Sequence, residues 1–125
     1  MKYRKVGKSG LVISEIALGS WLTYGNYVEK QTALECLETA VENGVNFIDS
    51  AEIYAKGKAE SLIGEFLERE TVSRDDLVLS SKVFWPMTDD INRWGLSRKN
   101  IHKSIRGSLD RLGTDYLDIY YMHRY

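Results

Sequence analysis

The sequence predicts an α/β fold in which a β-hairpin precedes a parallel sheet. Short apolar segments bounded by turns alternate with longer segments whose apolar residues recur at helical spacing. Strands that alternate with helices favour parallel pairing through right-handed crossovers. The 125-residue length and a hydrophobic content of 43% suit one packed domain, with the hairpin at 1–15 and β/α units at 16–125.

The individual elements follow from local signals. YRKV and LVISEIALG flank the glycine-bracketed turn GKSG, which predicts the hairpin and a following strand. Ser97 is placed as the N-cap of the last helix and Gly113 lies past its end, with an apolar stripe at Ile101, Ile105, Leu109 and Leu112. The predicted helices are 31–44, 58–70 and 97–113, and the predicted core strands after EIALG are 45–50, 76–84 and 116–124.

Composition narrows the classes of function. The net charge is −1 and no block of like charge occurs, which argues against nucleic acid or an anionic membrane as a partner. No apolar stretch approaches the roughly 18 residues typical of a membrane-spanning helix, so we expect no insertion into a membrane. The single cysteine, Cys36, is expected to be a small buried residue, and a reducing, cytoplasmic setting fits it.

Polar residues occur where the predicted strands end. Asp49, Lys82 and His123 lie near the carboxyl ends of three successive core strands, and Tyr54 follows Asp49 by five residues. The carboxyl ends of parallel strands form the site face of α/β folds. We therefore expect these four side chains to converge.

Each of the four residues also has a purely structural interpretation. Asp49 and Lys82 would suit an ion pair between neighbouring strands, His123 a satisfied core histidine and Tyr54 a loop aromatic. Together, however, they form a set with a chemical purpose. A free tyrosine has a pKa of about 10, and a neighbouring cation favours its ionised form. Such a site can exchange a proton with a carbonyl oxygen, while the hydride must come from a nicotinamide cofactor; no metal site is predicted.

Four segments of the chain resemble the aldo-keto reductase superfamily, in the branch that contains the potassium-channel β subunits. They are YRKVGKSGLVISEIALGSW, FIDSAEIYAKGKAESLIG, LVLSSKVFW and GLSRKNIHKSIRGSLDRLGTDYLDIYYMHR. The resemblance covers essentially the whole chain, with the motifs in order. It implies a (β/α)8 barrel whose floor is closed by an N-terminal hairpin, and an NADPH-linked reduction of small aldehydes and ketones.

The resemblance also implies roles for single residues. Tyr54 would be the general acid, Asp49 and Lys82 its tuning pair, and His123 the residue that orients the substrate. Glu60 matches a position with a structural role in supporting the turn. The implied cofactor contacts are Gly19, Ser20, Trp21 and Asp49, and the implied substrate pocket comprises Trp21, Tyr54, Trp85 and His123.

Two alternatives remain open at this point. Trp85 and Trp94 either border the substrate pocket or pack their loop against the fold. The chain is either an enzyme or a redox-sensing subunit of the channel-associated type. Members of that type typically carry asparagine where His123 stands, so the histidine favours catalysis.

The length departs from the resemblance. A (β/α)8 barrel needs about 250 residues, and the 125 residues here provide only its N-terminal half. The implied cofactor is NADP(H), but most of the family's cofactor site belongs to the other half of the barrel. We therefore expect the chain alone to be inactive, and to self-associate or to require a complementary C-terminal half.

Overall fold

A computed structural model describes residues 1–21, 24 and 27–125. Two antiparallel strands, β1 (Tyr3–Lys5) and β2 (Val12–Ser14), form the hairpin. The parallel sheet has the order β3 (Leu18–Gly19), β4 (Phe47–Asp49), β5 (Val78–Val83) and β6 (Ile119–Met122). The helices are α1 (Lys30–Glu42), α2 (Lys58–Glu68) and α3 (Arg98–Leu112), with short 3-10 helices η1 (Tyr54–Gly57) and η2 (Arg74–Asp76).

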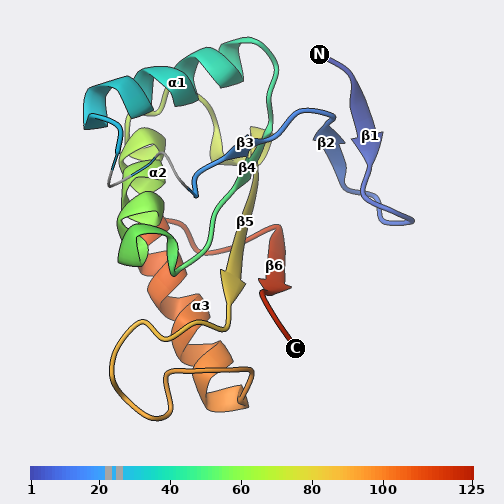
Figure 1. Cartoon of the computed structure of the whole chain (residues 1–125). Helices are drawn as coiled ribbons and strands as arrows, with labels where there is room; N and C mark the ends of the chain where they lie inside the picture. Colours follow the sequence, from blue (N-terminus) through green and yellow to red (C-terminus); the bar gives the residue numbers. More distant parts are fainter. Residues whose placement is uncertain (22–23, 25–26) are drawn as a thin grey trace.

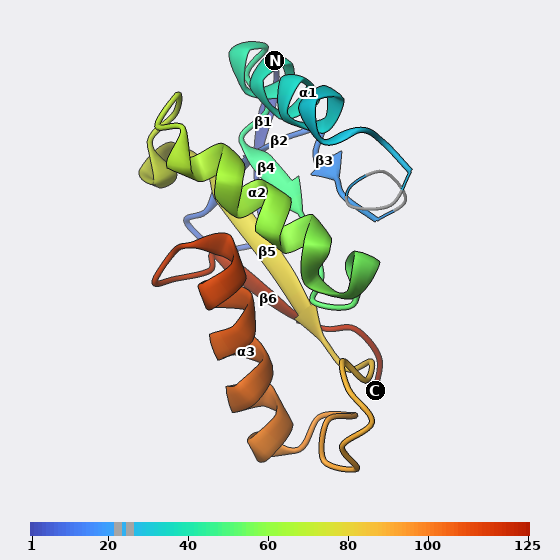
Figure 2. The same ribbon diagram turned by 90° about the vertical axis from the view of Figure 1, so that its left-hand side faces the viewer.

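All three long helices lie on one face of the four-stranded sheet (Figure 1). Figure 2 shows the helices in front and the strands behind them. Apolar side chains fill the space between these layers, among them Leu34, Leu37, Ile48, Ile63, Phe66 and Leu79. The predicted α/β fold is confirmed, and its one-sided helical layer is that of the N-terminal half of a (β/α)8 barrel.

The hairpin is attached at the amino end of β4 through Asn46. The Asn46 side chain accepts a hydrogen bond of 2.7 Å from the Ser14 amide, and the Asn46 amide donates to Ser14 Oγ at 3.2 Å. The Tyr3 hydroxyl donates to the carbonyl oxygen of Gly44 at 2.9 Å. The hairpin therefore lies at the end of the sheet opposite the carboxyl ends of the strands.

Helices α2 and α3 approach each other closely at Gly64. A Cβ atom added there would overlap the carbonyl oxygen of Arg111, so only glycine permits this contact. The Arg111 side chain runs beside Gly57, where φ is +88°, and beside Gly107. It ends in an ion pair with Glu60, whose Oε2 lies 2.7 Å from Nε.

The sequence predicts that α3 buries an apolar stripe, and this prediction is wrong. The fully buried residues are Leu112 and three polar ones, Asn100, Ser104 and Ser108. They cover buried polar groups, since Arg93 lies 3.3 Å from Asn100 Oδ1 and Ser81 lies 3.4 Å from Ser108 Oγ. The predicted stripe residues Ile101, Ile105 and Leu109 are only half-buried.

The prediction for Cys36 is also wrong. Its side chain is exposed, because α1 buries the side that carries Ala33, Leu34 and Leu37. Cys36 directly precedes Leu37, so its side chain is turned away from the buried side by about 100°. The helix predicted over 31–44 is confirmed, since α1 ends at Glu42 and Gly44, just past it, adopts a φ of +85°.

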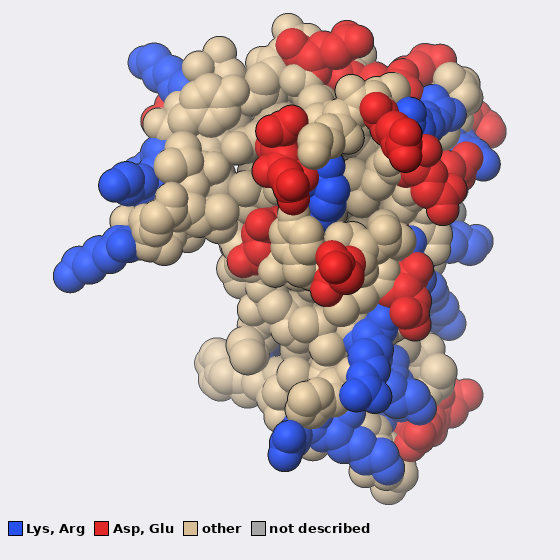
Figure 3. All heavy atoms as spheres, turned by 180° about the vertical axis from the view of Figure 1, so that it is seen from behind, with Lys and Arg blue, Asp and Glu red and all other residues tan. Residues whose placement is uncertain are grey.

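The surface carries charges of both signs. Acidic and basic side chains both occur on the face in Figure 3, and neither sign covers it. Within the part of the chain that the structure describes, no helix is both long enough and apolar enough to cross a bilayer.

Candidate active site

Three parallel strands and one short helix bring the four predicted residues together. Asp49 is the last residue of β4, Lys82 lies one residue before the end of β5, and His123 directly follows β6. The His123 amide donates to the carbonyl oxygen of Val83 at 2.9 Å, which continues the β5–β6 pairing up to the histidine. Tyr54 begins η1, so it stands in a helical turn and not in the loop that its sequence predicts.

The ammonium group of Lys82 is the centre of this cluster. It donates to Asp49 Oδ2 at 2.8 Å, to the carbonyl oxygen of Ser50 at 2.7 Å and to the Tyr54 hydroxyl at 3.1 Å. A lysine has three N–H donors, so each proton has its own oxygen. The other carboxylate oxygen of Asp49 accepts a hydrogen bond of 2.5 Å from Ser80 Oγ.

The Tyr54 hydroxyl therefore accepts a hydrogen bond and keeps its own proton available for another group. The Tyr54 ring stacks on Trp21 with centroids 6.2 Å apart, and it meets His123 edge-on at 6.0 Å. Two residues that follow it, Ala55 and Lys56, adopt the left-handed region at φ of 49° and 51°. Such a conformation costs a non-glycine residue about 1 kcal/mol, so the turn that presents Tyr54 is strained.

His123 lies against a largely positive environment. Burial lowers the pKa of its imidazole below the usual 6.5, and the positive charges of Lys82 and Arg124 lower it further, against an opposing effect of Asp49. Its Nδ1 atom is buried and, among the residues that the structure describes, has no hydrogen-bond partner. Burial and the neighbouring positive charges thus both favour the neutral imidazole.

We expect the His123 imidazole to titrate below pH 6.5. The unfolded chain then binds this proton at a higher pH than the folded chain, so the free energy of unfolding decreases as the pH falls below 6.5. Imidazole NMR spectra recorded across this range measure the midpoint, with His123→Asn to identify the resonance. A midpoint at or above 6.5 would contradict the placement.

Two neighbouring hollows meet at His123. One, of about 530 Å³, lies on the sheet face without helices and is lined by Ala17, Gly19, Phe47, Asp49, Lys82, Tyr121, Met122 and His123. The other, of about 360 Å³, is lined by Trp21, Ile53, Tyr54, Trp85, His123 and Arg124. Lys82 lines the larger hollow and Tyr54 the smaller one, and the hydrogen bond between them joins the two linings.

The remaining predicted residues have different surroundings. A Cβ atom on Gly19 would meet nothing within 4 Å, so space is open beside it. Ser20 is buried, and its hydroxyl bonds to the carbonyl oxygen of Asp49 at 3.1 Å and to Ser50 Oγ at 3.0 Å. Trp85 lines the smaller hollow, whereas Trp94 packs edge-on against Phe84 with centroids 6.2 Å apart.

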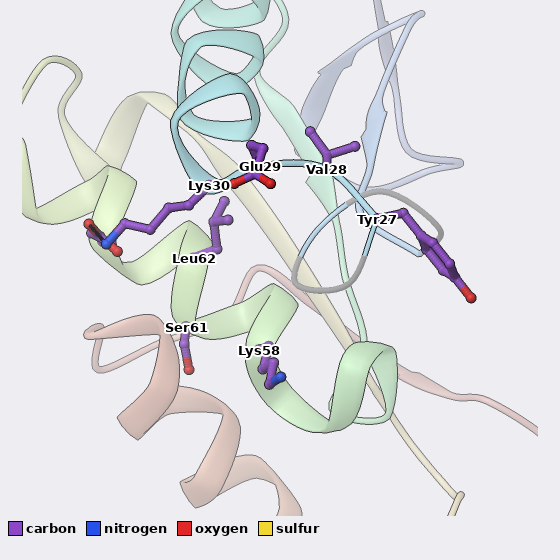
Figure 4. Close-up of a pocket in the computed structure, with 8 residues that line it drawn as sticks. Tyr27, Val28, Glu29, Lys30, Lys58, Ser61 and Leu62 are labelled. Carbon is purple, nitrogen blue, oxygen red and sulfur yellow. Dashed lines mark ion pairs between the residues drawn. The ribbon is translucent and has the colours of Figure 1, made fainter.

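A third hollow, of about 430 Å³, lies on the helical side between the start of α1 and α2 (Figure 4). Its lining includes the ion pair between Lys30 and Glu65, at 2.6 Å. None of the four predicted residues belongs to its lining.

Sequence reasoning missed Ser50, Ser80 and Arg124 as parts of the site. The two serines hold Lys82 and Asp49 through a carbonyl oxygen and a hydroxyl, and such ordinary residues carry no recognisable signal. Arg124 directly follows His123, so the sequence could have predicted that it lies near the site at the end of a core strand.

Comparison with known proteins shows the family of the chain. The Aldo/keto reductase family matches residues 15–125. The chain belongs to the aldo/keto reductase family. Two relatives named "Probable voltage-gated potassium channel subunit beta" match 124 residues, one from Oryza sativa subsp. japonica at 43% identity and one from Arabidopsis thaliana at 42%. Each match covers 99% of this chain but only 38% of the relative.

Solved aldo-keto reductases share the fold. An enzyme from Bacillus halodurans in its holo form aligns at 31% identity with a TM-score of 0.83, over 96% of this chain and 39% of that chain. An enzyme from Klebsiella pneumoniae in complex with NADPH aligns at 33% identity with a TM-score of 0.74, over 90% and 36%. A thermostable reductase in complex with the inhibitor epalrestat aligns at 35% identity with a TM-score of 0.82, over 98% and 43%.

Proposed function

We propose that this chain carries the proton-donating and substrate-orienting residues of an NADPH-dependent reductase of aldehydes and ketones. The contact between Lys82 Nζ and the Tyr54 hydroxyl, at 3.1 Å, is the observation that supports it most directly. An ammonium group that donates to the phenol oxygen stabilises the oxygen when its proton leaves. Asp49, at 2.8 Å from Lys82, balances the charge of the ammonium group.

His123 would orient the substrate. A neutral imidazole can donate one hydrogen bond to the oxygen that Tyr54 protonates. Trp21 and Trp85 line the same hollow and offer apolar faces to the rest of the molecule. In this arrangement the carbonyl carbon faces the larger hollow, where a cofactor would lie.

The larger hollow suits the nicotinamide part of NADP(H). The open space beside Gly19 leaves room for a flat ring, and Asp49 lies on the same lining. When bound, the cofactor supplies the hydride that no side chain can supply. Trp21 lines the adjoining smaller hollow and would approach this ring only from that side, and Ser20 would support the ring indirectly by fixing the ends of β3 and β4. A cytoplasmic setting, with its supply of reduced cofactor, remains part of the proposal.

A hybrid barrel tests the proposal. We define it as residues 1–125 joined to the part of the Bacillus halodurans enzyme that this chain does not cover. That enzyme is chosen because its backbone aligns with this chain at a TM-score of 0.83. The expected result is oxidation of NADPH, followed at 340 nm, that depends on an added neutral aldehyde. Cofactor binding without turnover of any aldehyde would contradict the proposal.

A second candidate is a redox-sensing subunit that binds a channel, and the relatives' names support only the channel-associated part of it. It rests on the 43% identity over 124 residues to a probable potassium channel subunit beta. Tight NADPH binding with negligible turnover, together with recovery of a membrane protein in a pull-down, would favour this candidate. His123 favours the enzyme, since a histidine can orient and polarise a carbonyl group.

We expect the purified 125-residue chain to self-associate. Among the described residues, β3 and β6 are the edges of the sheet, and the β6 residues Tyr121 and Met122 are 40% and 58% exposed. Unpaired edges with apolar side chains are templates for pairing with another chain. Light scattering measures the mass, and a C-terminal barrel half added in excess is expected to replace the self-association. A stable monomer that binds NADPH would contradict this expectation.

A further inference from the structure

Arg124 lines the hollow that holds the proposed proton donor. The hollow of about 360 Å³ is lined by Trp21, Ile53, Tyr54, Trp85, His123 and Arg124. The guanidinium carbon lies 5.9 Å from the centroid of the Trp85 ring, on its face. At this distance the indole face attracts the cation and leaves the N–H donors of the guanidinium group free.

The charge of Arg124 is not balanced within the site. In the described ranges 1–21, 24 and 27–125, its guanidinium takes part in no ion pair or side-chain hydrogen bond. Lys82 differs, since its ammonium group is bound to Asp49, Ser50 and Tyr54. The positive charge of Arg124 also reaches His123, whose pKa it helps to lower. Among the described residues, Arg124 is thus an exposed cation on the lining of the smaller hollow whose donors are not bound to oxygens of Asp49, Ser50 or Tyr54.

We propose that Arg124 is a specificity-determining residue that binds a carboxylate of the substrate. This proposal rests on the proposed function and names its substrate class: aldehydes or ketones that carry a carboxylate beyond the reacting carbonyl group. The carbonyl oxygen lies at Tyr54 and His123, the body of the substrate lies between Trp21 and Trp85, and the carboxylate meets the guanidinium group. An arginine can bind a carboxylate through two parallel hydrogen bonds.

The experiment compares two aldehydes of nearly equal shape, 4-carboxybenzaldehyde and its methyl ester. The ratio of their kcat/KM values in the hybrid barrel, the acid over the ester, is expected to fall about fivefold in Arg124→Gln, which is the effect of about 1 kcal/mol for a partly exposed ion pair. Arg124→Lys is expected to retain part of the ratio. Arg4→Gln removes an equal charge from the exposed hairpin strand and is expected to leave the ratio unchanged.

A binding measurement keeps the inference testable without turnover. Tryptophan fluorescence of the full 125-residue chain is titrated with terephthalate monomethyl ester and with the neutral dimethyl ester. Weaker binding of the acid in Arg124→Gln, with unchanged binding of the dimethyl ester, supports the subsite. Equal ratios in the wild-type chain and in Arg124→Gln would overturn it. If neither aldehyde is reduced but the charge-dependent binding persists, the proposed function fails while the anion subsite stands.

Discussion

Replacing Tyr54 by phenylalanine is expected to lower kcat for aldehyde reduction in the hybrid barrel by about 10²–10⁴-fold, the range for loss of a general acid. The phenylalanine ring retains the packing against Trp21 and His123, whose centroids lie 6.2 and 6.0 Å away, and removes only the hydroxyl next to Lys82. The cofactor affinity is expected to remain within about twofold, because an interaction specific to the transition state leaves ground-state binding unchanged. Steady-state kinetics and NADPH fluorescence measure the two quantities.

Tyr27→Phe is the matched control. Tyr27 is 81% exposed and lines the hollow on the helical side, so loss of its hydroxyl is expected to leave kcat unchanged. Wild-type turnover in Tyr54→Phe would show that another group donates the proton. A parallel loss of turnover and of cofactor affinity would point to disruption of the site.

Replacing Arg111 by methionine is expected to destabilise the chain by about 3 kcal/mol, the lower end of the range for breaking a buried ion pair. The Glu60 side chain is completely buried, and Arg111 Nε donates to its Oε2 at 2.7 Å while Ser81 Oγ donates to Oε1 at 2.6 Å. Without Arg111, the carboxylate would keep only the serine bond. Urea unfolding followed by circular dichroism measures the change in the free energy of unfolding.

Two variants make this result specific to the ion pair. Arg106→Met alters an exposed arginine of the same helix and is expected to change stability by less than about 0.5 kcal/mol. Combining Glu60→Met with Arg111→Met removes both charges and is expected to recover much of the loss. Equal destabilisation by Arg111→Met and the double variant would show that packing of the arginine stem beside Gly57 and Gly107 dominates.

The succession of elements was predictable because each carries its own local signal. Ser97 accepts a hydrogen bond of 3.1 Å from the Asn100 amide, and Gly113 adopts a φ of +64°, so both ends of α3 are where the sequence predicts them. The buried face of α3 was not predictable from periodicity. That face is set by polar partners outside the helix, Arg93 in the preceding loop and Ser81 in β5, and a hydrophobic pattern contains no information on a buried polar cluster.

The site was predictable to the same extent. Parallel pairing fixes which strand ends adjoin, so Asp49 and Lys82 had to be neighbours, and the register pairs Asp49 with Ser80. The third acceptor of Lys82, the carbonyl oxygen of Ser50, depends on the backbone path of a single turn. The position of Arg124 was likewise not predictable, because only the backbone path after β6 decides whether its side chain lines the smaller hollow. The roles of these residues in catalysis remain predictions.

The three hydrogen bonds of Lys82 have a consequence for covalent chemistry. A lysine condenses with an aldehyde to form a Schiff base only when a nitrogen lone pair reaches the carbonyl carbon. Here each N–H of the ammonium group points at an oxygen, of Asp49, Ser50 or Tyr54, at 2.7 to 3.1 Å. An electrophile held beside Tyr54 therefore meets no free amine. The arrangement that we propose for proton transfer would also keep Lys82 from condensing with the aldehydes that we propose as substrates.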